Sequence, residues 1–183
     1  VKLVHEKNNR IDCVINASYP RNSNEQKKIP FIPLDEFNQN ISIHLGAYFN
    51  VMQCMVNYFL IQGHGNIINI SSIQAVAAPK FQHYLGTSLF SGIEYTASKS
   101  AIIAITRYMA KYLKDKNIRI NCVSPGGILD NQDPQFLENY SKSCINKGML
   151  SCEDIVGAIQ FLSSDDSKFI NGQNIIVDDG WTL

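Results

Sequence analysis

The sequence predicts an α/β fold built on a parallel β-sheet, and two features carry that prediction. Four short runs rich in Ile and Val, each bounded by polar residues or glycine, are typical of strands buried on both faces. Between them lie longer stretches in which apolar residues recur every three or four positions, as on the buried side of a helix. Strands that alternate with helices form parallel sheets covered by helices. We expect one domain over residues 1–183.

The predicted strands lie at residues 11–15, 66–71, 118–123 and 174–178, with the sequences IDCVI, NIINIS, IRINCV and NIIVD. Their apolar residues are nearly continuous, which indicates a sheet with neither face toward water. A complete doubly wound sheet has two mononucleotide-binding halves. This chain supplies one half and one further strand, and no G-x-G-x-x-G loop follows a strand.

Three long helices are predicted at residues 35–62, 92–115 and 151–163. The first ends at Gly63. An S-x-x-E capping box formed by Ser91 and Glu94 predicts the start of the second. Ser151 opens the third, which has acidic residues in its first turn.

The segments between these elements are expected to be loops, at residues 17–34, 72–91 and 124–150. The last loop contains a short helix that begins at Pro134, a residue type favoured in the first helical turn.

The composition excludes several classes of function. Sixteen Lys and Arg balance 16 Asp and Glu, so no basic surface for nucleic acid is expected. The longest apolar region, residues 41–61, is interrupted by polar side chains, and we expect no membrane span and no signal peptide. Five scattered cysteines and four histidines without ligand spacing predict free thiols, a cytoplasmic location and no metal site.

Tyr95 and Lys99 are the candidate catalytic pair. They lie four positions apart near the start of the second predicted helix, so their side chains share one helix face. An ammonium beside a phenol lowers the phenol pKa by roughly 1–3 units, which lets a tyrosine exchange protons nearer neutral pH. Tyr112 and Lys116 repeat the spacing at the end of this helix, where we expect an exposed pair without function.

Six segments, in order, resemble the short-chain dehydrogenase/reductase family, an NAD(P)-dependent family with a Rossmann fold. They are CVINAS (13–18), HLGAYFNV (44–51), GNIINISS (65–72), YTASKSAI (95–102), IRINCVSPGG (118–127) and INGQNIIVDDGWTL (170–183). The fourth is similar to the family's Y-x-A-S-K-A active-site helix. The resemblance covers essentially the whole chain. It implies a three-layer, Rossmann-like, doubly wound parallel sheet whose N-terminal βαβαβ portion is absent from these residues.

The resemblance also implies roles for individual residues. Ser72 should hydrogen-bond the substrate oxygen, Tyr95 should be the acid/base, and Lys99 should bind the nicotinamide ribose and lower the Tyr95 pKa. Ser71 should be structural. The implied contacts with NAD or NADP are Asn16, Ala17, Ser18, Tyr95, Lys99, Pro125, Gly126, Gly127 and Ile128.

Three positions depart from the family pattern. His44 occupies the place of a catalytic asparagine that belongs to a proton relay. It either relays protons through water, with a pKa near neutrality, or fills the same space without relaying. Ser18 replaces a glycine, and its Cβ could narrow the approach of the cofactor. Asp130 replaces the threonine that holds the cofactor's carboxamide, which weakens the expectation of a contact there.

The loop between Ser72 and Tyr95 is longer than the family's usual one, with 23 positions from one residue to the other. A long loop at the mouth of a site often shapes the substrate pocket. His83, within it, is expected at the surface rather than in contact with a ligand.

The expected substrate is small and polar. The segment from Pro125 to about residue 150 carries Asn and Gln and few large apolar groups. YPRN (19–22) and GGILDNQDPQFLENY (126–140) resemble bacterial members linked to flagellin modification and sialic-acid-like sugar biosynthesis, which implies a sugar or a sugar nucleotide. Arg21, Lys27 and Lys28 are expected in a solvated loop rather than on a substrate phosphate.

Two hypotheses remain open. The chain is either part of an NAD(P)-dependent oxidoreductase, or a non-catalytic fragment or scaffold subunit that keeps an oligomer interface and cannot bind cofactor. The family's N-terminal half, with its glycine-rich phosphate loop, is absent, and we expect the sequence to be part of a longer protein. Helices 35–62 and 92–115 are apolar on more than one face, which by resemblance implies a homodimer or homotetramer.

Overall fold

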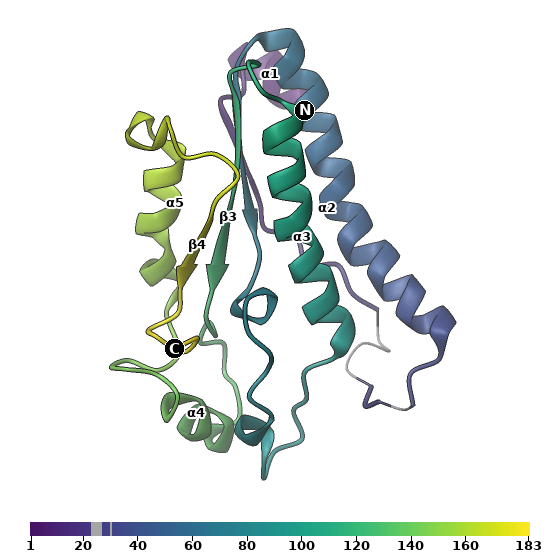
Figure 1. Cartoon of the computed structure of the whole chain (residues 1–183), viewed down its shortest axis with the longest axis vertical. Helices are drawn as coiled ribbons and strands as arrows, with labels where there is room; N and C mark the ends of the chain where they lie inside the picture. The colour runs from purple at the N-terminus through teal and green to yellow at the C-terminus, as the bar shows by residue number, and fades with distance from the viewer. Residues whose placement is uncertain (23–26, 30) are drawn as a thin grey trace.

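A computed structural model describes residues 1–22, 27–29 and 31–183. The helices and strands are α1 (Lys2–Asn8), β1 (Cys13–Asn16), α2 (Leu34–Gln62), β2 (Gly65–Ile70), α3 (Ile93–Tyr112), β3 (Ile118–Pro125), α4 (Pro134–Ser141), α5 (Val156–Ser163) and β4 (Asn174–Val177). Short 3-10 turns, η1 (Ile73–Ala75) and η2 (Phe81–Tyr84), lie between β2 and α3, and η3 (Cys152–Ile155) leads into α5. Figure 1 shows the long helices α2 and α3 side by side along the sheet.

The four strands form a parallel sheet in the order β1-β2-β3-β4. Near the carboxyl ends, Asn16 pairs with Asn69 and Pro125 pairs with Val177. The carboxyl ends therefore form one edge, where open parallel sheets bind ligands.

Helices cover both faces of the sheet, which makes three layers and confirms the predicted fold class. Ile67 of β2 packs in the core under α2 and α3, whereas its neighbour Ile68 packs with Leu162 of α5 on the other face. Successive strand residues face opposite sides. Burial of both faces thus explains why the strand sequences are almost continuously apolar.

The element boundaries differ from the predicted ones by a few residues, as is usual for sequence-based boundaries. The first strand begins at Cys13 instead of residue 11, and the third extends to Pro125. Helix α3 ends at Tyr112, short of the predicted residue 115, and Asp115 has a left-handed φ of 64°. Helix α1 was not predicted, because it buries none of its residues and has no apolar stripe to recognise.

The predicted capping box of Ser91 and Glu94 is wrong. The residue before α3 is Gly92, and no side chain caps the helix. The Ser91 hydroxyl instead donates to Oε1 of Gln74, at 2.7 Å, and the Glu94 side chain is buried. By contrast, Ser151 starts its helical segment as expected, although the first turn is the 3-10 turn η3 and α5 itself begins later.

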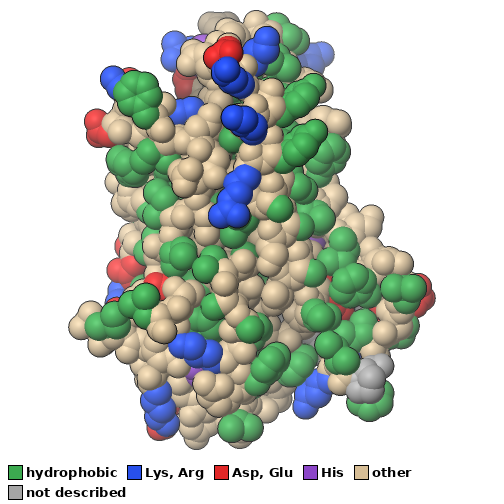
Figure 2. All heavy atoms as spheres, in the orientation of Figure 1, with side chains coloured by type: hydrophobic (Ala, Val, Ile, Leu, Met, Phe, Trp, Pro, Cys, Tyr) green, Lys and Arg blue, Asp and Glu red, His purple; other side chains and the backbone are tan. Residues whose placement is uncertain are grey.

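The outer face of α2 and α3 exposes several large apolar side chains, including Leu60, Ile61, Tyr108 and Tyr112. Figure 2 shows apolar and basic groups mixed over this side of the molecule. No described helix combines the length and the apolar character needed to cross a bilayer. All five cysteines lie within the described residues and are free thiols, as predicted.

Candidate active site

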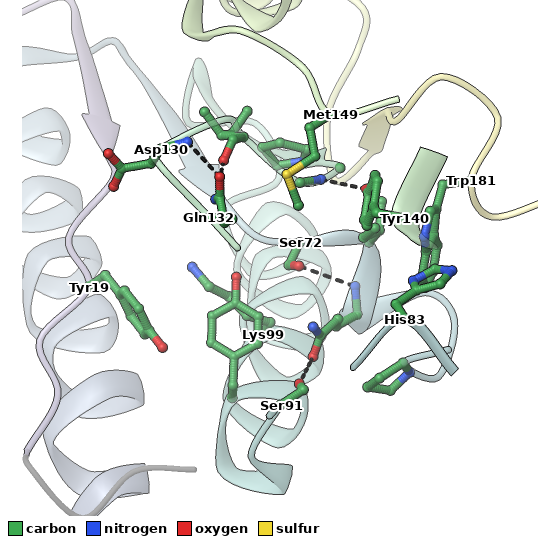
Figure 3. A pocket seen from close by; sticks show the side chains of 18 of the residues that line it. Tyr19, Ser72, His83, Ser91, Lys99, Asp130, Gln132, Tyr140, Met149 and Trp181 are labelled. Atoms are coloured by element: carbon green, nitrogen blue, oxygen red, sulfur yellow. Dashed lines mark hydrogen bonds between the residues drawn. The ribbon is translucent and has the colours of Figure 1, made fainter. Parts of the chain in front are cut away.

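A cleft of about 640 Å³ opens at the carboxyl edge of the sheet, a volume typical of small-molecule sites. Residues that follow β1, β2 and β3 line it, together with the start of α3, the η1–η2 segment and α4. Figure 3 shows Tyr19 and Lys99 toward one end and His83, Tyr140 and Trp181 toward the other, with Ser72 between them.

Tyr95 and Lys99 both line this cleft from the first two turns of α3. The Lys99 side chain is buried, and its Nζ lies 5.6 Å from the centre of the Tyr95 ring. Nζ donates to the carbonyl oxygen of Ile70, at 2.9 Å, and to Oη of Tyr48, at 3.3 Å. These bonds hold the ammonium group beside the tyrosine, as the four-residue spacing predicted.

The second pair with the same spacing lies elsewhere. Tyr112 is the last residue of α3 and is 74% exposed, and Lys116 follows the end of the helix. Neither residue lines the cleft. The two pairs therefore provide a natural comparison between a site position and a surface position.

Tyr48 was predicted only as an apolar helix position, but it supports the site. It is fully buried, and its Oη donates to the carbonyl oxygen of Ile70, at 2.8 Å, while accepting the bond from Lys99. Burial raises the pKa of Tyr48 far above its ordinary value, so the phenol stays neutral. The sequence signal that could have identified Tyr48 as a site residue is its position one helical turn after His44.

Ser71 and Ser72 follow β2 and have different partners. Oγ of Ser72 accepts the N–H of Gln74, at 3.2 Å, and Ser72 lines the cleft. A hydroxyl that accepts one bond can still donate its proton to a bound oxygen. Oγ of Ser71 donates to the carbonyl oxygen of Lys99, at 2.8 Å. This bond ties the strand end to α3, in keeping with the structural role predicted for Ser71.

His44 lies beside Tyr95 and contacts the rings of three tyrosines, Tyr19, Tyr48 and Tyr95. Its ring centroid is 5.0 Å from that of Tyr19 and 6.0 Å from that of Tyr95. His44 does not line the cleft, whereas Tyr19 does. Burial, aided by the charge of Lys99, lowers the pKa of His44 to about 4. The expected pKa near neutrality is therefore wrong, because the imidazole is too poorly solvated to hold a charge.

Of the three predicted cofactor residues after β1, only Ala17 lines the cleft. The Asn16 side chain is buried, and its Nδ2 donates to the carbonyl oxygen of Tyr48, at 3.4 Å. Oγ of Ser18 donates to Oδ1 of Asn16, at 3.1 Å. Asn16 and Ser18 thus connect the end of β1 to α2.

The segment from Pro125 to Ile128 lines the cleft as predicted. Its glycines are also required by packing within the protein. A Cβ on Gly126 would lie 3.0 Å from Cα of Asp178, and one on Gly127 would lie 2.7 Å from Cε of Met149. The N–H of Gly127 donates to Oη of Tyr140, at 2.6 Å.

The far wall of the cleft is aromatic and was not predicted. His83, expected at the surface, is buried: its Nε2 lies 2.8 Å from Oγ of Ser143, and its ring packs against Tyr140 and Trp181. Burial, together with the nearby charge of Lys80, lowers the pKa of His83. The long loop folds inward because it shares a small hydrophobic core with α4 and the chain's end.

Polar groups line the opposite rim. The guanidinium of Arg21 lies 5.3 Å from the centre of the Tyr19 ring, and Arg21 lines the cleft although it is solvent-exposed. Asp130 and Gln132 also line it, and Nε2 of Gln132 donates to the carbonyl oxygen of Ile128, at 2.8 Å. Lys27 pairs instead with Glu36 of α2.

Comparisons with known proteins identify relatives of the chain. A family model described as enoyl-(acyl carrier protein) reductase matches residues 1–182. The chain is 44% identical, over 180 residues, to the post-translational flagellin modification protein A of Campylobacter coli, covering 97% of this chain and 70% of that protein. It is 30% identical to the 7alpha-hydroxysteroid dehydrogenase of Bacteroides fragilis, covering 95% of this chain and 65% of that protein.

The chain is also similar to a solved structure. The short chain dehydrogenase of Leptospira borgpetersenii with bound NAD+ superposes with a TM-score of 0.87 at 32% identity, covering 99% of this chain and 69% of that one. The chain belongs to the short-chain dehydrogenase/reductase family.

Proposed function

We propose that this chain forms the catalytic part of an NAD(P)-dependent oxidoreductase that moves a hydride between a nicotinamide cofactor and an alcohol or carbonyl of a polar substrate. The observation that carries the proposal is the pairing of Tyr95 and Lys99 one turn apart on α3, with Ser72 on the same cleft. Membership of a family of dehydrogenases and reductases supports it.

In this proposal Tyr95 is the acid/base. Its Oη gives a proton to the substrate oxygen when a carbonyl is reduced, and takes that proton back when an alcohol is oxidised. The ammonium of Lys99 favours the phenolate form of Tyr95. Ser72 donates its hydroxyl proton to the substrate oxygen and fixes its position.

The described residues fit the nicotinamide end of a cofactor, NAD or NADP. Ala17, Lys99 and the segment Pro125–Ile128 line one continuous cleft. A bound nicotinamide would supply or accept the hydride. The Leptospira relative was solved with NAD+.

We infer a polar substrate, a sugar or a sugar nucleotide. Arg21, Asp130 and Gln132 place charged and amide groups on the cleft. The Campylobacter relative is named for flagellin modification, which supports a role of that kind. We place this role in the cytoplasm, as the sequence predicts. Aromatic groups beside a few placed polar groups are typical of small-molecule sites.

A second candidate function is a non-catalytic scaffold that assembles as a homodimer or homotetramer through α2 and α3. Two observations favour it. His44 stands where the family has an asparagine of the proton relay, and its pKa of about 4 keeps it neutral. The exposed apolar side chains on α2 and α3 would suit subunit contacts.

Tyr95→Phe in the full-length protein separates the two candidates. Turnover would be followed as oxidation of NADH or NADPH with a panel of keto sugars and sugar nucleotides. We expect Tyr95→Phe to lower kcat by about 10²–10⁴-fold, because the phenyl ring cannot transfer a proton. Tyr112→Phe is the matched control and should keep full activity.

The outcomes distinguish the candidates because assembly is measured alongside turnover. Loss of turnover in Tyr95→Phe, with unchanged oligomeric state, supports the oxidoreductase. Full turnover in Tyr95→Phe would contradict the assigned role of Tyr95. A parent protein that assembles but turns over no substrate and binds neither dinucleotide would favour the scaffold.

A further inference from the structure

The seam between α2 and α3 has an unusual composition at its amino-terminal end. Asn40 and His44 lie four positions apart on α2, and Glu94 and Ser98 lie four positions apart on α3, so each pair shares one helix face. The two helices pack against each other, and the His44 ring contacts Tyr95 of α3. The four side chains are nearly inaccessible, with exposures of 3%, 3%, 1% and 1% in that order.

None of these polar atoms has a hydrogen-bond partner among the residues that the structure describes. Both amide atoms of Asn40, both ring nitrogens of His44, both carboxyl oxygens of Glu94 and the hydroxyl of Ser98 are buried and unpartnered. A buried polar group without a partner is costly, and native proteins pair nearly all of them, often with enclosed water. Further along, the seam is apolar and packs Met55 against Ile102 in the main core. Within α2 and α3 themselves, the unpartnered buried atoms all lie at this end.

That end adjoins the proposed catalytic tyrosine. Glu94 precedes Tyr95 in the chain and lies in the first turn of α3, where the helix dipole favours a negative charge. Among the described residues, the ionisable groups beside Tyr95 include His44 on α2, Tyr19 after β1 and Lys99 on α3. The nearest charged pair toward the start of α2 joins Lys27, which precedes the helix, to Glu36, which lies one turn before Asn40.

We propose that this polar end of the seam encloses ordered water, and that the Glu94 carboxylate, bonded through that water to His44, is a positioning residue that sets the proton affinity of Tyr95. The proposal rests on the proposed function of Tyr95. Glu94 itself does not line the cleft. Its negative charge opposes the loss of a proton from the neighbouring phenol, against the effect of Lys99.

The test uses the full-length protein and two variants. Glu94→Gln keeps size and polarity but removes the charge, and Glu94→Met keeps the length but removes the polarity. We expect a crystal structure of the parent to show water bridging Glu94 and His44. We expect Glu94→Gln to lower the Tyr95 pKa by about half a unit or more. Glu94→Met should turn over more slowly than the parent, because a thioether cannot hold the bridging water.

Two of these measurements are independent of turnover. The Tyr95 pKa is read from phenolate absorbance, as the difference between each protein and its Tyr95→Phe derivative, and the pH profile of kcat gives a second value. Glu6→Gln, an exposed acid on α1, is the matched control and should change neither. If the parent turns over no substrate, the proposed function is contradicted. The crystal structure and the phenolate absorbance of Tyr95 still test the proposal about Glu94.

The proposal is overturned by a dry seam in the crystal, or by a Tyr95 pKa that is the same in the parent and Glu94→Gln. Full activity with an unchanged pH profile in Glu94→Met would also overturn it, because Glu94 would then only fill space.

Discussion

Two of the groups that hold Lys99 carry no opposite charge. A backbone carbonyl at Ile70 and the neutral phenol of Tyr48 accept its protons. Its charge is therefore not cancelled by these two bonds and can act on the ring of Tyr95, 5.6 Å away. The two bonds thus fix the ammonium beside the proposed acid/base.

We expect Lys99→Met to lower kcat/KM by about 10²-fold or more. Loss of the ammonium raises the Tyr95 pKa, so the rising limb of the oxidation rate should move to higher pH. Steady-state kinetics across pH would measure both effects. Lys116→Met, from the exposed second pair, serves as the control. An unmoved limb in Lys99→Met would show that Lys99 does not tune Tyr95.

Tyr48→Phe tests the support of Lys99. The variant keeps the ring in the core but removes one of the two acceptors named above, so Lys99 retains only the Ile70 carbonyl of that pair. We expect a loss of about 1 kcal/mol in the free energy of unfolding, measured with denaturant, and a fall in kcat of about tenfold. Tyr108→Phe, on the exposed side of α3, should change neither quantity.

At the scale of elements, the strands and long helices could be predicted because their burial pattern is local. Ile67 and Ile68 are buried on opposite faces of the sheet. A strand buried on both faces has a continuous apolar sequence, which can be recognised without knowing the fold. The α3 capping box could not be predicted, because Ser91 is engaged by Gln74, 17 positions earlier in the chain. Helix α1 buries none of its residues and therefore has no pattern to recognise.

The residues of the candidate site likewise fall into those that the sequence could predict and those that it could not. Tyr95, Lys99 and Ser72 could be predicted because their spacing and strand-end position carry the chemistry. His83 and Trp181 could not, because they meet only when the long loop and the chain's end fold against α4. The low pKa of His44 likewise arises from burial between α2 and its neighbours, which the residue type alone does not reveal.

The residues at the start of the α5 segment make a pH-dependent contribution to the stability of the folded protein. Lys147 and the backbone and hydroxyl of Ser151 lower the pKa of Asp154 to about 2. This value lies below the ordinary aspartate pKa of about 3.9. The stabilisation is therefore present above that ordinary value and is lost as the pH falls toward 2.

We expect Asp154→Asn to lower the thermal midpoint near neutral pH, with a difference from the parent that shrinks below about pH 4. Calorimetry across pH would measure it. Asp165→Asn, for which the structure shows no comparable set of bonds, is the control. A difference that stayed constant with pH would exclude the carboxylate charge as its cause.

At the scale of the whole molecule, the outer side of α2 and α3 exposes large apolar side chains among basic ones. Tyr108 is 70% exposed and stacks on Tyr112, with ring centroids 6.2 Å apart, on the outer side of α3. Packing this face against a second copy would form the proposed homodimer or homotetramer.

Tyr108→Asp should weaken that assembly, because it places a charge in an apolar contact. Sedimentation equilibrium of the full-length protein would detect the shift toward monomer. Lys142→Asp, an exposed charge change on α4, is the control and should leave the oligomer intact. An unchanged oligomer in Tyr108→Asp would show that the interface does not include this face of α3.

Trp181 is the single tryptophan among the 183 residues, and it forms part of the cleft wall with the ammonium of Lys80 lying 4.6 Å from its ring centre. Indole emission responds to nearby charge and to energy acceptors. The cleft therefore carries its own fluorophore, and occupancy by a dihydronicotinamide could be followed optically without attaching a dye.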